Sequence, residues 1–125
     1  TLNATNNLAF TLLRAGRSQE SEEMFRGAVE SARRFLPPDH WFLGVVIGSH
    51  GAALAACERF DEAEATLLDG YRISSEVLGA DHGRCQTIAA HLMRLYRSLD
   101  AQHPEAGHAA SAERWRSLAG EQGED

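Results

Sequence analysis

Histidines and cysteines are the residues of this chain that could bind a metal ion, and their spacing decides whether they do. Cys57 and Cys85 lack the close pairing that a zinc site requires. His103 and His108 stand five positions apart, which places them on different faces of a helix. We therefore expect two free cysteines that pack between helices, no metal site and no metal cofactor.

Sequence motifs for catalysis or cofactor binding do not occur in the chain. It contains no phosphate-binding loop, no dinucleotide fingerprint, and no His-Glu-x-x-His or Gly-x-Ser-x-Gly pattern. Paired carboxylates such as Glu22 and Glu23 are expected on an exposed helix face, and Gly44 and Gly48 have the spacing that lets helices approach closely. The sequence thus predicts no cofactor and a chain that is not an enzyme.

The composition is that of a globular domain of 125 residues, with 43% hydrophobic and 24% charged residues. The longest apolar stretch, near Trp41–Ile47, is far shorter than the ~18–20 residues that span a bilayer. The net charge of −6 argues against nonspecific binding of nucleic acid, which needs a basic surface. We therefore expect neither a membrane nor a nucleic acid as a partner.

The first residue and the choice of basic residues suggest the origin of the chain. It begins with Thr1 rather than Met, and all 12 basic residues are Arg. From this we expect a fragment of a larger bacterial protein, and we expect it in the cytoplasm.

An internal repeat of 42 residues organises the sequence. The segment 36–40, Leu-Pro-Pro-Asp-His, recurs as Leu-Gly-Ala-Asp-His at 78–82, and the Arg-Ser-Gln-Glu-Ser-Glu of 17–22 recurs as Arg-Phe-Asp-Glu-Ala-Glu at 59–64. A third unit fits with one inserted residue near 100–102 and is divergent, as terminal repeats usually are. The repeats are expected at 1–41, 42–82 and 83–119.

Apolar residues with helical spacing predict two helices in each repeat. Leu8 and Leu12, for example, are expected to be buried together. The residues from 120 to 125 are polar and are predicted to be a disordered tail. The six predicted helices cover about 2–15, 19–36, 42–57, 60–78, 83–99 and 103–119.

Glycines, prolines and aspartates indicate where these helices begin and end. Gly16 and Gly79 are expected to end helices, as are Pro37 and Pro38. The aspartates expected to cap the following helices are Asp39, Asp61 and Asp81. Pro104 is predicted in the first turn of the last helix, and the repeated His40 and His82 in structural turns.

The repeated motifs resemble those of tetratricopeptide repeats, most closely the 42-residue form found in kinesin light chains and bacterial regulators. The resemblance rests on Asn6-Asn7-Leu8-Ala9, Gly16-Arg17, Glu20-Ser21-Glu22, Phe25, Ala28, Leu36 and Asp39-His40, together with the second copies at 59–64 and 78–82. It implies an all-α, right-handed α-solenoid of three helix–turn–helix repeats. It also implies a protein-interaction module within a larger regulatory or signalling protein. His50-Gly51 stands where Leu-Ala would be usual, which predicts looser packing there.

The resemblance also implies a concave groove lined by the first helix of each repeat. Rotating these helices places one stripe of side chains opposite the predicted core. The family uses asparagines at such positions to hold a peptide backbone, and the small middle residues leave room for a ligand side chain beside Phe10. The predicted partner-binding residues are Asn3, Asn6, Asn7, Phe10, Arg14, Ser49, Ala52, His91, Arg94 and Arg97.

Charge predicts the class of partner. The first helices, with the fifth ending at residue 99, contain Arg14, Arg84, Arg94 and Arg97 but no acid, whereas most acids lie on the second helices. Because Arg pairs well with carboxylates, the sequence favours a protein or peptide partner that is acidic or presents a C-terminal carboxylate.

Two other functions remain open at this point. A fragment of a solenoid exposes apolar faces that neighbouring repeats would cover, so a homo-oligomer formed through the end repeats is the main alternative. A small-molecule sensor would need a pocket between Phe10 and the floor formed by Gly48 and Ala52. Sedimentation at several concentrations distinguishes self-association from a monomer with an open groove.

Overall fold

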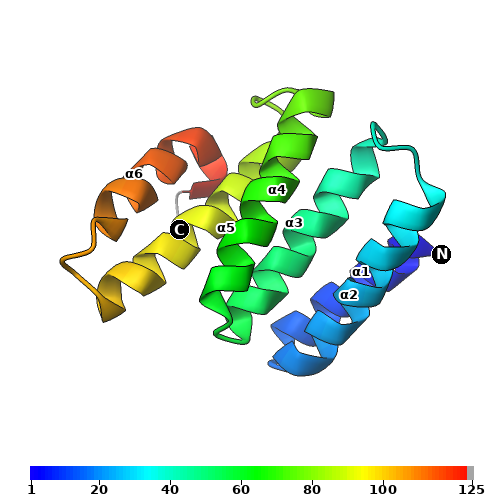
Figure 1. Ribbon diagram of the computed structural model, residues 1–125, viewed down its shortest axis with the longest axis horizontal. Coiled ribbons are helices and arrows are strands. Elements are labelled where there is room, and N and C mark those ends of the chain that lie inside the picture. Colours follow the sequence, from blue (N-terminus) through cyan, green and yellow to red (C-terminus); the bar gives the residue numbers. More distant parts are fainter. Residues whose placement is uncertain (124–125) are drawn as a thin grey trace.

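The computed structural model describes residues 1–123, and these form a row of helices with no strand. Successive helices pack against each other, so three helix pairs follow in chain order from one end of the molecule to the other (Figure 1). This confirms the predicted all-α solenoid. The helices are α1 Leu2–Arg14, α2 Ser18–Phe35, α3 Trp41–Ala56, α4 Phe60–Leu78, α5 Gly83–Gln102, α6 His108–Ala119 and the short 3-10 helix η1 Gly120–Gly123.

Glycines end the first helix of repeat 1 and the second helix of repeat 2, as expected. Gly16 has φ 82° just after α1, and Gly79 has φ 90° just after α4. These are backbone conformations that favour glycine because a side chain would clash. The second helix of repeat 1 ends at Phe35, ahead of Pro37 and Pro38, which cannot continue it.

Histidines, rather than the predicted aspartates, cap the first helices of repeats 2 and 3. His40 Nδ1 accepts a hydrogen bond from the Phe42 amide at 3.1 Å, and His82 Nδ1 accepts one from the Arg84 amide at 3.1 Å. The prediction of Asp39 and Asp81 as caps was wrong because each stands one residue too early. The structural role expected for the two histidines is confirmed.

Asp61 is not the cap of α4 either. It lies inside the first turn of that helix, after the N-cap residue Arg59. There its charge still meets the positive end of the helix dipole.

The third repeat departs most from its predicted boundaries. Helix α5 continues to Gln102, and α6 begins only at His108, after Gly107 with φ 85°. Pro104 therefore lies in the connecting turn and not in a first helical turn. In place of a disordered tail from Gly120, η1 packs against α5 and α6; residues 124–125 of that predicted tail lie outside the described residues.

The core runs between the helix pairs in two clusters, one around α1, α2 and α3 and one around α4, α5 and α6. Within repeat 2 the helices approach very closely, since a methyl group on Gly70 would lie 2.7 Å from the Gly48 nitrogen. A methyl group on Gly51 would lie 2.6 Å from Leu67 Cγ. The looser packing predicted at His50-Gly51 was therefore wrong, because Gly51 is what permits this contact.

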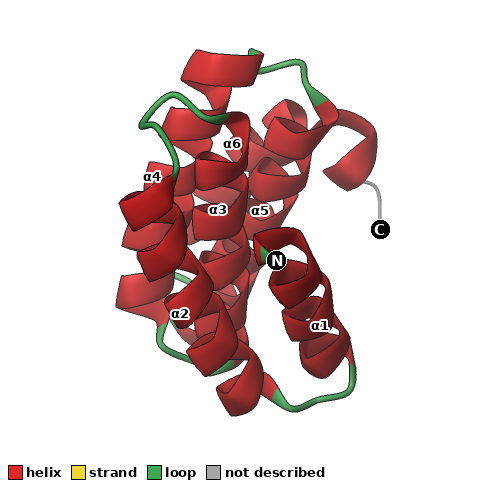
Figure 2. Cartoon of the chain, turned by 90° about the vertical axis from the view of Figure 1, so that its right-hand side faces the viewer, coloured by secondary structure: helices red, strands yellow, loops and turns green. Residues whose placement is uncertain are grey.

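Helix α1 packs on one side only. It contacts α2 and α3, and Figure 2 shows it standing at the edge of the helix array beside α2. Leu8 on this helix is 52% exposed, so its predicted burial was wrong. Its counterpart two repeats later, Leu92, is fully buried.

Candidate peptide-binding groove

The first helices of the three repeats lie next to one another, because α1 contacts α3 and α3 contacts α5. Along this row the surface is hollowed by two cavities of about 220 Å³ each. Both are lined by His91, which stands between them. The Asn cavity is lined by Asn6, Asn7, Phe10, Val45, Ser49, Arg84, Thr87, Ile88 and His91, and the Ala cavity by Ala52, Ala55, Ala56, Phe60, His91, Arg94, Leu95 and Ser98.

Two asparagines from α1 form one wall of the Asn cavity. Asn7 is exposed, but Asn6 is buried, and its Oδ1 has no hydrogen-bond partner among the described residues. Leaving a buried amide oxygen unpaired costs about 1–3 kcal/mol.

Phe10 is fixed by the core of repeat 1. Its ring meets Phe25 edge to face, with centroids 5.0 Å apart, an arrangement that aromatic pairs prefer. The ring is half-buried and turns its remaining surface to the Asn cavity. It therefore offers a rigid apolar contact to whatever enters.

Small residues of α3 line both cavities. Ser49 lines the Asn cavity, and its hydroxyl donates a hydrogen bond to the Val45 carbonyl at 3.0 Å. Ala52 lines the Ala cavity, so the space above it lies beside Phe60 and His91. The room beside Phe10 is bounded by Ser49, whereas the room over Ala52 belongs to the Ala cavity.

His91 is uncharged in the groove at neutral pH. Its half-buried position and the nearby Arg94 guanidinium lower its pKa to about 4. A neutral imidazole has one N–H donor and one acceptor. His91 can therefore bond either to an amide or to a carboxylate of a bound chain.

Arginines supply the charge of the groove. Arg84 lines the Asn cavity and Arg94 the Ala cavity, and no carboxylate lines either cavity in the described part of the chain. The longer α5 does include one acid, Asp100, so the prediction of acid-free first helices was wrong for that helix. Asp100 lines neither cavity.

Three of the predicted residues lie elsewhere. Arg97 is close enough to Glu113 of α6 to help lower the pKa of that carboxyl, after the larger effect of Arg116. Arg14 lines neither groove cavity, and Asn3 lines a separate cavity near Trp41. Phe60 was not predicted from the sequence as a site residue. It forms part of the Ala cavity because α4 begins at this residue, shortly after the end of α3.

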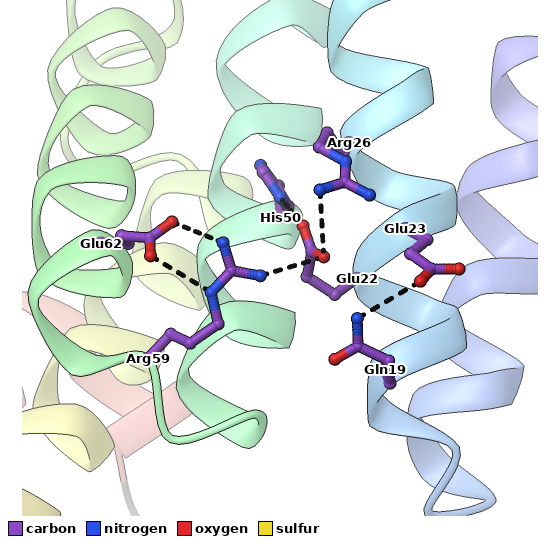
Figure 3. A network of polar contacts seen from close by, with 7 residues as sticks. All are labelled: Gln19, Glu22, Glu23, Arg26, His50, Arg59 and Glu62. Atoms are coloured by element: carbon purple, nitrogen blue, oxygen red, sulfur yellow. Dashed lines mark hydrogen bonds and ion pairs between the residues drawn. The ribbon is translucent and has the colours of Figure 1, made fainter.

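A buried ionic network fixes α3 against the preceding helix pair (Figure 3). Glu22 Oε2 accepts a hydrogen bond from His50 Nε2 at 2.8 Å, and Arg59 Nη1 lies 3.1 Å from Glu22 Oε1. Arg26 adds a weaker contact at 3.8 Å. The predicted exposure of Glu22 was wrong because α3 covers its carboxylate completely.

The described residues contain no cluster of three or more side chains suited to bind a metal ion. Burial raises the pKa of both Cys57 and Cys85, which keeps these thiols protonated. No helix in the described region is long and apolar enough to cross a bilayer.

A family model of the tetratricopeptide repeat matches residues 1–41 and 51–83. The chain belongs to the tetratricopeptide repeat family. A search of curated proteins found no match. The first matched segment covers α1 and α2, and the second covers the end of α3 and all of α4. Helix α5 after its first residue, and α6, lie outside both segments. Tetratricopeptide repeats generally mediate protein–protein interaction.

Proposed function

We propose that this tetratricopeptide chain holds an acidic peptide segment of a partner protein across α1, α3 and α5. The observation that carries the proposal is the row of two cavities joined at His91, with an arginine in each and no carboxylate lining either among the described residues. On a chain with a net charge of −6, this groove offers an acidic segment two arginines without a lining carboxylate among the described residues.

The groove offers the types of contact that an extended peptide needs. Asn6 and Asn7 carry amides that can pair with a peptide backbone, which presents one donor and one acceptor per residue. The guanidinium of Arg94 can pair with a side-chain or terminal carboxylate. Phe10 provides apolar surface beside them.

A peptide array tests this proposal. Acidic peptides and peptides ending in a free carboxylate are offered to the wild type and to an Asn6→Ala, Arg94→Ala double variant at two salt concentrations. We expect salt-sensitive capture by the wild type and a loss of about tenfold or more in affinity in the double variant, because a charged contact and an amide contact are removed together.

The matched control is Arg72→Ala. Arg72 is exposed on α4 and lines neither cavity, yet its removal changes the net charge by the same amount as removal of Arg94. The affinity of the Arg72→Ala variant for acidic peptides should stay within about twofold of wild type. Absence of capture by the wild type, or equal losses in control and double variant, would overturn the groove assignment.

Self-association is the second candidate, and two exposed apolar side chains favour it. Leu8 is 52% and Phe35 73% exposed. Sedimentation over a wide range of concentrations decides between the two: a dimer that dissociates on dilution and is lost in Leu8→Ser would support self-association. A monomer at every concentration would leave the peptide-holding function. A small-molecule site is disfavoured because each groove cavity, at about 220 Å³, is below the usual range of about 300–1,000 Å³.

A further inference from the structure

A third cavity lies at the end of the groove where α1 and α3 begin. It measures about 250 Å³ and is lined by Leu2, Asn3, Leu36, His40, Trp41 and Phe42. We call it the Trp cavity. Its polar groups are few, because His40 Nδ1 already accepts the hydrogen bond from the Phe42 amide. What it offers a ligand is mainly apolar surface.

Trp41 is held in one orientation although it is 39% exposed. His40 stacks on it with ring centroids 5.7 Å apart, and Phe42 meets it edge to face at 5.4 Å. Arg84 covers its ring with the guanidinium carbon 4.6 Å from the centroid. An exposed aromatic ring that is fixed in this way loses little side-chain entropy when a partner contacts it.

Arg84 connects this cavity to the groove. Its side chain lines the Asn cavity while its guanidinium lies over Trp41 of the Trp cavity. In residues 1–123 no carboxylate forms an ion pair with Arg84. A guanidinium that stacks through its face keeps its N–H groups in the plane of its edge, where they can still donate to a carboxylate.

We propose that the Trp cavity binds an apolar side chain, aromatic or long aliphatic, of the same peptide that occupies the groove, directly next to an acidic residue that pairs with Arg84. This inference rests on the proposed function and adds a specificity to it. The charge of Arg84 beside an apolar hollow selects an apolar residue adjacent to an acidic one. The peptide would then run from the Trp cavity through the Asn cavity to the Ala cavity.

Selection from a random peptide library displayed on phage tests the inference. The wild type, Trp41→Ala, Arg84→Gln and Phe35→Ala are screened in parallel after their thermal unfolding has been compared. Phe35→Ala is the matched control, because Phe35 is an exposed aromatic side chain close in sequence that does not line the Trp cavity.

The wild type and Phe35→Ala should enrich peptides with an apolar residue next to Asp or Glu. Trp41→Ala should lose the preference for an apolar residue and keep the preference for an acidic one. Arg84→Gln should lose the preference for an acidic residue and keep the preference for an apolar one. A peptide selected on the wild type should bind Trp41→Ala about tenfold or more weakly, since burial of one large apolar side chain is worth at least that much.

Each other outcome overturns the inference in a distinguishable way. If the wild type enriches acidic peptides but Trp41→Ala enriches the same apolar and acidic pattern, the Trp cavity is not a subsite and the proposed function stands. If the wild type enriches no peptide, the proposed function fails and the subsite fails with it. If Trp41→Ala instead converts a sedimenting dimer to a monomer, a second copy of the chain occupies the cavity.

Discussion

The two interfaces between successive repeats use the same place in the repeat for different interactions. Glu22 on α2 and Glu64 on α4 are separated by one 42-residue period. At the first interface, Glu22 is fully buried and meets His50 and Arg59. At the second, Glu64 is half-buried and accepts one hydrogen bond from the Tyr96 hydroxyl at 2.5 Å.

The neighbours of these glutamates differ accordingly. Leu92 stands where the first interface has His50, and it belongs to a cluster that includes Leu67 and Leu95. The first interface thus holds a buried charge that needs its cationic partners, whereas the second is held by apolar packing with one polar contact at its edge. The comparison teaches that the repeat fixes which helix faces meet, while side chains at equivalent positions decide what kind of interaction joins them.

The largest effect is expected from truncating the apolar interface. Leu92→Ala should lower the free energy of unfolding by about 3 kcal/mol, because it removes a fully buried side chain and leaves a cavity. Leu8→Ala, at the same place in repeat 1, should cost less than about 0.5 kcal/mol because Leu8 is half exposed. Urea denaturation followed by circular dichroism measures both. Similar losses in the two variants would show that Leu8 is packed as tightly as Leu92 in solution.

The ionic interface should come next. Glu22→Gln keeps the shape of the side chain but removes the charge. It should lower the free energy of unfolding by about 2 kcal/mol, because a buried charge loses its hydrogen bond to His50 and its ion pair with Arg59. Glu64→Gln is the paired control and should cost under about 1 kcal/mol. Equal losses would mean that the two interfaces do not differ in the way the contacts indicate.

The smallest effect is a dependence on pH at the second interface, where α5 carries His91. Its pKa of about 4 lies below the ordinary value of 6.5, so the unfolded chain takes up a proton as the pH falls through 6.5, while the folded chain resists until about 4. Stability should therefore fall across this window by about 1 kcal/mol, as the site is partly solvated. His91→Gln should lose less stability than wild type over the same window. If the free energy of unfolding falls equally with pH in the wild type and in His91→Gln, the effect of His91 is excluded.

The fold and the groove face followed from the 42-residue period, because an exposed stripe found on one helix is carried to the next by the repeat. Asn6, Ser49 and His91 accordingly lie around one cavity. The burial of Glu22 could not be predicted in this way. It depends on His50, 28 positions away on the next repeat, and no pattern within α2 distinguishes Glu22 from its exposed neighbour Glu23.

The third repeat shows where the period stops being informative. One inserted residue near 100–102 moves the turn, and Pro104 suggested a helix start where the chain is still turning. His40 and His82 were placed in turns correctly, but their capping bonds depend on which residue directly precedes the helix. A single residue of error in a helix boundary is enough to exchange Asp39 for His40.

Helix α1 supplies Asn6, Asn7 and Phe10 to the groove, yet it packs only against α2 and α3 at one end of the helix row. The last helix of a stack detaches at a lower free energy than an interior one. A peptide bound across α1, α3 and α5 would stabilise α1 against local unfolding. Amide hydrogen exchange along α1, faster than along α3 in the empty protein, should slow when the groove is filled, so occupancy would be read as a change in the local dynamics of one terminal helix.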